Sequence, residues 1–123
     1  MAKKILFVDD EPDVLRVAVF RLKKSGYEII TAVNGKEAWE SAINIRPDLV
    51  ILDLRLPDIM GDEVCKMIKA EPTLSKTPVI LFTASVGNIS EKIKISGADD
   101  FIAKPFDYVQ LLGKINKLIG QEE

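Results

Sequence analysis

Hydrophobic residues along this chain form short continuous runs, and the segments between the runs repeat apolar residues every three or four positions. The short runs predict β-strands, because they are rich in branched or aromatic residues and end at polar or turn residues; they are residues 5–8, 29–32, 49–52, 79–82 and 101–103. The intervening spacing is typical of amphipathic helices, and its apolar positions are Val14, Ala18, Leu22; Ala38, Ala42, Ile45; Val64, Met67, Ile68; Ile89, Ile93; and Val109, Leu112, Ile115, Ile119. The predicted order is strand then helix, five times over.

Residues that favour helix ends agree with this order. Asp10 or Glu11 can cap the first helix, which accepts Pro12 in its opening turn, Asn34 begins a turn into the second helix, and Asp107 can cap the last. Glycines stand where helices should stop, at Gly26, Gly97 and Gly120. Continuous apolar strands with a helix after each one imply a parallel sheet covered on both faces, which is a three-layer α/β sandwich.

Length and composition narrow the picture further. With 123 residues, 47% of them hydrophobic, we expect a single domain over residues 1–123 and no output domain in this chain. The 17 basic and 19 acidic side chains nearly cancel and form no basic block, so direct nucleic-acid binding is not expected. One cysteine and no long apolar run indicate a reducing, cytoplasmic location without membrane contact. The absence of histidine excludes Ser-His-Asp, Cys-His and histidine-zinc chemistry within the chain.

Polar residues follow four of the predicted strands. Asp9 and Asp10 come after the first, Asp53 after the third, Thr83 after the fourth and Lys104 after the fifth. Right-handed crossovers bring the carboxyl ends of parallel strands to one edge of the sheet, where ligands bind. We therefore expect these five side chains to meet at that edge.

Such a cluster of acids calls for a cation. Two carboxylates about 4 Å apart repel by roughly 4 kcal/mol at an effective dielectric constant near 20. Mg²⁺ suits an all-oxygen site shared between one or two carboxylates, water and phosphate. Lys104 can then pair with a phosphoryl group, and the Thr83 hydroxyl can hydrogen-bond one of its oxygens. These residue types predict a phosphate and metal site.

Four motifs at these positions carry a family resemblance that spans about the whole chain: VDDE at 8–11, ILDLRLP at 51–57, FTAS at 82–85 and AKPF at 103–106. Together they resemble the receiver (CheY-like) domain of two-component response regulators. The resemblance implies a flavodoxin-like (βα)5 fold with a five-stranded parallel sheet in the order 2-1-3-4-5.

The resemblance also implies a role for each residue. Asp53 is the nucleophile that accepts the phosphoryl group, Asp10, Asp53 and the backbone carbonyl of Arg55 bind Mg²⁺ directly, Asp9 acts through water, and Lys104 pairs with the phosphoryl oxygens. Further roles concern the switch and the lifetime of the phosphoryl group: Thr83 and Phe101 move as a switch, Ala84 leaves room for the phosphate, and Arg55 and Ser85 tune dephosphorylation.

Partners follow from the same resemblance. The donor is a phosphohistidine of a sensor histidine kinase or a histidine phosphotransfer protein, and it must belong to another protein because this chain has no histidine. The expected outcome is phosphorelay signalling by a protein that promotes only its own phosphorylation and dephosphorylation and is not otherwise an enzyme. An unidentified output partner would bind the face made by the fourth helix, fifth strand and fifth helix, and a phosphorylation-dependent homodimer is a further hypothesis.

Two departures from the family pattern bear on these expectations. The loop after the phosphoacceptor reads Pro57-Asp58-Ile59-Met60-Gly61, whereas many receivers have Pro-x-Met-x-Gly, so the loop packing should differ. Phe101 lacks the hydroxyl of a tyrosine, so its switch would act by packing alone.

Competing interpretations stay open at this stage. Taken singly, the acids are caps or turn residues, and Thr83 and Lys104 are an ordinary strand residue and a solvated charge. A haloacid-dehalogenase-type hydrolase would need a second acid where Arg55 stands, and a flavin or nucleotide binder would need glycine-rich motifs that the chain lacks. A degenerate receiver that serves only as an interaction module is the remaining alternative.

Overall fold

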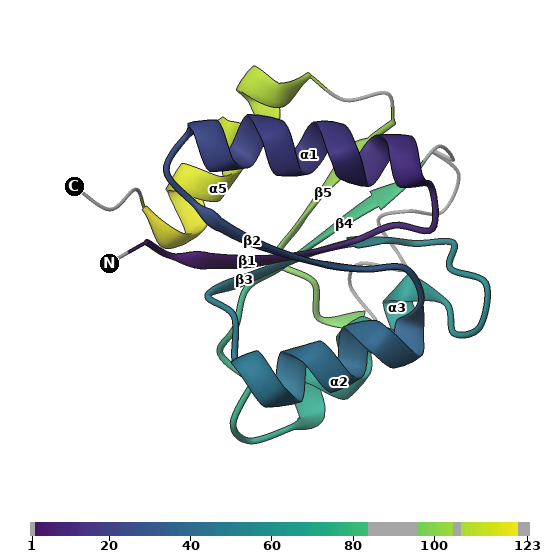
Figure 1. Ribbon diagram of the computed structural model, residues 1–123. Coiled ribbons are helices and arrows are strands. Elements are labelled where there is room, and N and C mark those ends of the chain that lie inside the picture. Colours follow the sequence, from purple (N-terminus) through teal and green to yellow (C-terminus); the bar gives the residue numbers. More distant parts are fainter. Residues whose placement is uncertain (1, 84–95, 105–106, 121–123) are drawn as a thin grey trace.

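A computed structural model describes residues 2–83, 96–104 and 107–120, which form a parallel sheet between two layers of helices (Figure 1). The strands are β1 (Lys4–Val8), β2 (Glu28–Ala32), β3 (Leu49–Asp53), β4 (Val79–Thr83) and β5 (Asp100–Ala103). The helices are α1 (Pro12–Lys24), α2 (Gly35–Ile45), α3 (Gly61–Ala70) and α5 (Tyr108–Ile119). The helix predicted around residues 89–93 lies outside the described residues. None of the helices in the described ranges is long and apolar enough to cross a membrane.

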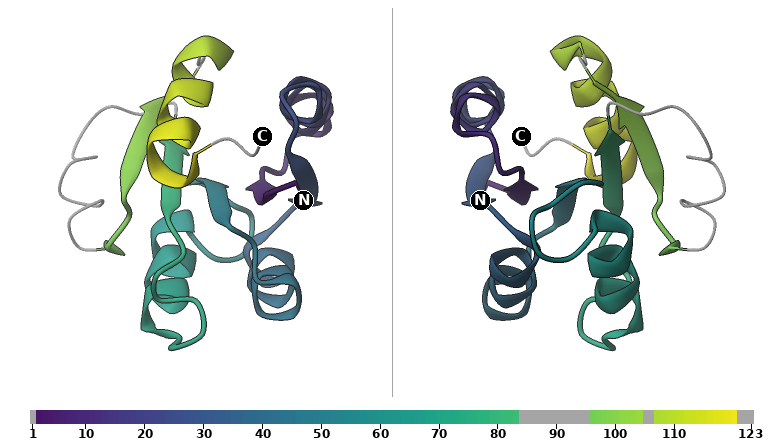
Figure 2. Two further views of the ribbon diagram at one scale, coloured as in Figure 1. Left: turned by 90° about the vertical axis from the view of Figure 1, so that its left-hand side faces the viewer. Right: turned by 90° about the vertical axis from the view of Figure 1, so that its right-hand side faces the viewer.

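The five strands are parallel and lie in the order β2-β1-β3-β4-β5, which confirms the predicted fold class. Helices α1 and α5 cover one face of the sheet, and α2 and α3 cover the other (Figure 1, Figure 2). Because β1 pairs with both β2 and β3, the chain reverses its direction of travel across the sheet after β2. The carboxyl ends of β1 and β3 therefore lie side by side at the point where a ligand site is expected.

Each face of the sheet has its own hydrophobic core, since successive strand residues point to opposite faces. Beneath α1 and α5, Phe7 and Phe82 are fully buried with their ring centroids 5.3 Å apart. Beneath α2 and α3, Leu6 and Leu81 belong to the second core. Strands with apolar residues on both faces read as the continuous runs seen in the sequence.

Two of the three helix starts considered in the sequence have a side-chain cap. The Asn34 side chain accepts a hydrogen bond from the Glu37 N–H at 2.8 Å, and Asp107 accepts one from Val109 N–H at 2.8 Å. At α1, within the part of the chain that the structure describes, Glu11 occupies the N-cap position without a side-chain hydrogen bond to the helix. Pro12 has no N–H to offer in that first turn. The acids after β1 are therefore left for another role.

The burial of two helix side chains bears on the predictions from the sequence, and for Val109 it differs from the expectation. Val109 is 78% exposed, because Leu111 and Ile115 set the buried stripe of α5 and leave the second helical residue pointing outward. Cys65, the single cysteine of the chain, is completely buried in the core beneath α2 and α3. Burial raises the pKa of its thiol to about 11, so the thiolate needed for reactivity is scarce.

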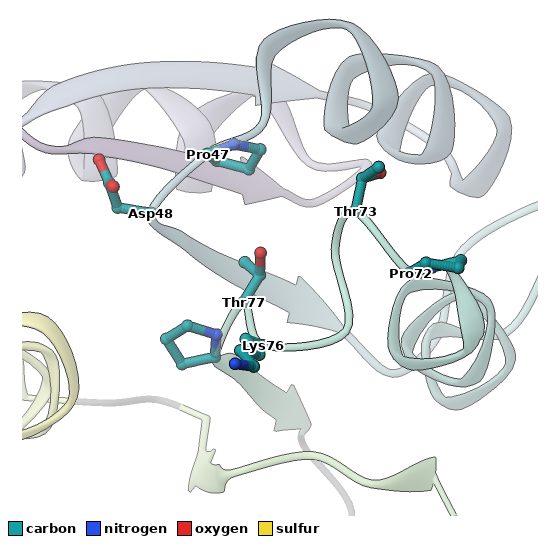
Figure 3. A pocket seen from close by; sticks show the side chains of 7 residues that line it. Pro47, Asp48, Pro72, Thr73, Lys76 and Thr77 are labelled. Atoms are coloured by element: carbon teal, nitrogen blue, oxygen red, sulfur yellow. The ribbon is translucent and has the colours of Figure 1, made fainter.

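At the amino ends of β3 and β4 the loops enclose a hollow of about 300 Å³, which Figure 3 shows from close by. Its lining residues are Pro47, Asp48, Pro72, Thr73, Lys76, Thr77 and Pro78. Asp48 already accepts a hydrogen bond from the Lys4 N–H at 2.8 Å, which ties this loop to β1. The hollow lies at the edge of the sheet opposite the acids.

Candidate functional site

The predicted polar residues meet at the carboxyl edge of the sheet. Asp9 follows β1, Asp53 ends β3, Thr83 ends β4 and Lys104 follows β5. A hollow of about 280 Å³ opens there, lined by Asp10, Glu11, Asp53, Arg55, Thr83 and Lys104. The fold thus brings together side chains separated by as many as 95 positions in the sequence.

Lys104 bridges two of the acids. Its ammonium donates to Asp9 Oδ2 at 3.0 Å and to Asp53 Oδ2 at 3.1 Å, and Glu11 Oε1 lies 3.8 Å away. The lysine reaches this position because its backbone N–H donates to the Thr83 carbonyl at 2.8 Å, which extends the β4–β5 pairing by one residue. The ammonium also lies 4.8 Å from the centroid of the Phe82 ring, a favourable cation–π distance.

Burial, hydrogen bonds and neighbouring charges together shift the pKa values of Asp53 and Lys104. Asp9 is fully buried and Asp53 is 6% exposed. Burial raises the pKa of Asp53, while the Arg55 N–H and the Lys104 ammonium oppose the rise. For Lys104, burial lowers the pKa, but the hydrogen bonds and charges of Asp9 and Asp53 together outweigh it and leave the pKa raised. Lys104 therefore stays protonated as the counter-ion of the buried acids.

The backbone around Asp53 is held from several sides. Leu54 N–H donates to the Phe82 carbonyl at 2.9 Å, and Arg55 N–H donates to Asp53 Oδ1 at 3.1 Å. Gly61, at the start of α3, packs so closely that an added Cβ would lie 2.1 Å from the Asp53 carbonyl oxygen. Only glycine fits there, which explains the turn glycine noted in the sequence. Asp53 is thus presented on a rigid strand end.

The acids fit a hard divalent cation. Asp9, Asp10 and Asp53 each have a carboxylate oxygen within 4.8 Å of the others, with Asp10 exposed to solvent. Lys104 supplies one positive charge against these acids and Glu11, so negative charge remains uncompensated at the rim. An all-oxygen donor set of this kind suits Mg²⁺ better than a transition metal.

The predicted switch residues lie on the neighbouring strands. Thr83 is 2% exposed beside Ala103 in the β4–β5 register, and Phe101, opposite Leu81, is 38% exposed. Ala84 and Ser85 lie outside the described residues. Phe82 entered the sequence analysis as the end of a predicted strand and the start of the FTAS motif, without a role at the site, but its ring lies under the Lys104 ammonium.

Comparison with known families gives one clear match. Residues 5–116 match the family model described as "Response regulator receiver domain". Among curated proteins, the chain is 36% identical to the "DNA-binding dual master transcriptional regulator RpaA" of Synechocystis sp. over 98% of this chain and 50% of that protein. It is 35% identical to the "Alkaline phosphatase synthesis transcriptional regulatory protein PhoP" of Bacillus subtilis, over 100% of this chain and 51% of that protein. The chain therefore spans about half the length of these relatives.

Solved structures with the same fold include receivers from several bacteria. The chemotaxis response regulator CheY4 of Vibrio cholerae has a TM-score of 0.90 at 28% identity, covering 96% of this chain and 99% of that one. The receiver domain of sensor histidine kinase PA1611 from Pseudomonas aeruginosa, with a magnesium ion coordinated in its active site cleft, has a TM-score of 0.90 at 30% identity, covering 98% and 100%. TrrA from Thermotoga maritima, in complex with Mg²⁺-BeF, has a TM-score of 0.86 at 38% identity, covering 94% and 98%.

Proposed function

Since the chain belongs to the response regulator receiver family, we propose that it receives a phosphoryl group on Asp53 from a phosphohistidine of a partner protein. The observation that carries this proposal is the buried Asp53 carboxylate, 3.1 Å from the Lys104 ammonium and ringed by further acids. A hydrolase of the haloacid-dehalogenase type receives no support, because the exposed Arg55 stands where that class needs a second acid.

The transfer itself needs little covalent chemistry from the protein. A carboxylate oxygen of Asp53 attacks the phosphorus, an O–P bond forms, and the P–N bond to the donor imidazole breaks with its electron pair going to the ring nitrogen. Lys104, already held at the site by Asp9 and Asp53, is placed to pair with the phosphoryl oxygens. The buried Thr83 hydroxyl can donate a hydrogen bond to one of the same oxygens.

Mg²⁺ is the cofactor that these residues favour. We assign Asp10, Asp53 and the backbone carbonyl of Arg55 as direct ligands and Asp9 as a ligand through water, supported by the grouping of the three carboxylates. Bound Mg²⁺ would neutralise the charge of the acids and of the phosphoryl group. The magnesium complexes of the PA1611 receiver and of TrrA are consistent with this assignment.

The output of the site would be a change in partner binding. In the proposed switch, Thr83 moves toward the phosphoryl group and Phe101 turns inward into the space that Thr83 leaves. The exposure of Phe101, 38% in this structure, supports the idea that its position is free to change. The chain would then act as a phosphorylation-controlled binding protein that catalyses only its own phosphorylation and dephosphorylation.

The partners belong to the same proposal. The donor would be a histidine kinase or a histidine phosphotransfer protein, and the output partner would bind the face that includes β5 and α5. Arg55, exposed beside Asp53, would influence the access of water to the acyl phosphate. A phosphorylation-dependent homodimer would show as a doubled molar mass in light scattering with a phosphate analogue, and a monomer in both states would discard it.

Intact mass spectrometry tests the central claim. After incubation with acetyl phosphate and Mg²⁺, we expect the wild-type mass to rise by one phosphoryl group, because Asp53 lies beside Lys104 and Mg²⁺ would neutralise the remaining negative charge. The gain should disappear in Asp53→Asn and in a sample treated with a chelator. An equal gain in Asp53→Asn would show that another residue is the acceptor and would overturn the assignment.

A further inference from the structure

The loop between β3 and α3, residues 54–60, leaves the core and returns to it. Leu54 and Leu56 are buried, Leu56 belongs to the core beneath α2 and α3, and Ile59 packs partly against the same core. Between these anchors Arg55 and Asp58 are exposed. The segment that carries the Arg55 carbonyl is therefore held by apolar side chains at both ends, but Asp58 between them is exposed.

The Asp58 carboxylate supplies an anchor at that point. Its Oδ1 accepts hydrogen bonds from Gly35 N–H at 2.7 Å and from Ile59 N–H at 2.8 Å, and its Oδ2 accepts one from Lys36 N–H at 3.0 Å. Gly35 and Lys36 are the first residues of α2. A carboxylate at a helix start also interacts favourably with the helix dipole. Asp58 thus ties the loop beside the phosphoacceptor to a neighbouring helix.

The facing surface of α2 is shaped for this contact. A Cβ added to Gly35 would lie 2.8 Å from Ile59 Cβ and 3.2 Å from Asp58 Oδ1, so the loop rests directly on the first turn of the helix. Gly35, interpreted from the sequence as part of a simple turn, therefore also provides the surface on which the loop packs. Gly35 on α2 and Asp58 in the loop therefore contribute to the same contact.

Helix capping alone does not account for Asp58. Helix α2 already has its own cap, because Asn34 accepts from the Glu37 N–H at 2.8 Å. Asp58 takes the N–H groups of Gly35 and Lys36 instead, from a loop 22 to 23 positions away in the sequence. The two acceptors act on separate donors of the same helix end. Asn34 therefore offers a matched control that weakens α2 without releasing the loop.

We propose that Asp58 is a positioning residue for the Asp53 site: its contact with the first turn of α2 holds the segment that presents the Arg55 backbone to Asp53 and to Mg²⁺. This inference rests on the proposed function, in which the Arg55 carbonyl is a metal ligand. The same loop departs from the usual family pattern, and here Ile59 packs partly against the core while Met60 is 40% exposed.

The test compares Asp58→Ala, Asp58→Asn and Asn34→Ala with the wild type. We expect Asp58→Ala to bind Mg²⁺ about 10-fold more weakly in calorimetric titration, at the lower end of losses seen when outer-shell partners of metal ligands are removed. Asp58→Asn, which keeps one acceptor oxygen, should fall between the wild type and Asp58→Ala. The backbone amide signal of Arg55 in NMR spectra should move in both Asp58 variants.

Asn34→Ala should lose thermal stability comparable to Asp58→Ala while keeping wild-type Mg²⁺ affinity and an unmoved Arg55 amide signal. Wild-type Mg²⁺ affinity in Asp58→Ala would overturn the inference. A loss of Mg²⁺ affinity in Asn34→Ala equal to that in Asp58→Ala would also overturn it, because the effect would then come from helix stability alone. If Asp58→Ala does not fold, Asp58→Asn decides by the same two readouts. Intact mass of the phosphorylated wild type tests the proposed function separately, so the two can fail independently.

Discussion

Among single side chains, Lys104 is a charged group that is largely buried and paired with buried acids. It contacts two buried carboxylates that were taken out of water by the fold, and it is itself only 18% exposed. A buried charge that loses its partner is costly, because the remaining group keeps its desolvation penalty. Lys104 therefore contributes to stability as well as to the proposed phosphoryl chemistry.

Replacing Lys104 tests this double role. We expect Lys104→Met to lower the free energy of unfolding by about 2 kcal/mol without Mg²⁺, somewhat less than for a fully buried pair because solvent reaches the site. Added Mg²⁺ should restore part of the loss, since a cation replaces the missing charge. Urea unfolding with and without Mg²⁺ measures both effects.

Lys66→Met is the matched control. Lys66 Nζ lies 3.3 Å from Glu63 Oε1 in an exposed pair on α3, and such pairs contribute less than about 1 kcal/mol. Equal destabilisation by the two substitutions would contradict the importance assigned to the buried cluster.

A second residue-scale prediction concerns pH and Asp58. Slight desolvation raises the pKa of its carboxyl, but the N–H groups of Gly35, Lys36 and Ile59 outweigh it and hold the pKa below the usual range. A depressed pKa in the folded state stabilises the fold above the unfolded pKa of about 3.9, and the contribution is lost as the pH falls through the folded value. The stability gap between wild type and Asp58→Asn should therefore close in acid.

Urea unfolding of both proteins between neutral pH and pH 3 measures that gap. Other acids titrate in both proteins and cancel in the comparison. A gap that stays constant across the whole range would mean that the charge of Asp58 does not contribute to the contact with α2.

At the scale of elements, α2 ends on a strained residue. Arg46 at its C-cap has φ 53° and ψ 68°, the left-handed conformation in which glycine is normally found. Pro47 follows directly and prevents the helix from continuing. Helix α2 therefore ends at a well-defined residue, and the backbone conformation of Arg46 is strained there.

Arg46→Gly should stabilise the protein by about 0.5–1 kcal/mol, because relief of the left-handed strain exceeds the extra freedom that glycine gives to the unfolded chain. Arg46→Ala keeps a Cβ in the same conformation and should bring no such gain. Thermal unfolding of the two variants checks this, and a gain with alanine equal to that with glycine would contradict the strain.

The elements themselves could be predicted closely from the sequence. All five strands match within a residue at each end, because strand signals here are dense runs of branched and aromatic side chains. The phase of α5 was partly wrong: Ile115 is buried as expected, but Val109 is exposed and Leu111, which was not among the expected positions, is buried. Near a helix start, several apolar residues compete for the buried stripe, and contacts with the sheet decide among them.

For the whole molecule, the sheet order is what turns distant residues into a site. β1 and β3 are neighbours although α1, β2 and α2 lie between them in the chain, so Asp9 and Asp53 end adjacent strands. Both hydrophobic cores support these central strands from opposite faces. The edge that carries Asp9 and Asp53 is therefore built on two strands whose hydrophobic residues are all buried.

For the residues that the structure describes, the sequence alone determined the order of elements, the parallel sheet class and the five side chains at its carboxyl edge, because periodicity and strand ends are local properties. Only the tertiary structure decided that Lys104 bonds Asp9 and Asp53, that Asp10 stays exposed, and that Asp58 reaches α2. These contacts depend on the relative positions of the ends of separate strands and helices. The positions must be right to within about the length of a hydrogen bond. The packing of the two cores sets these positions, and the hydrophobic periodicity of the sequence does not encode them.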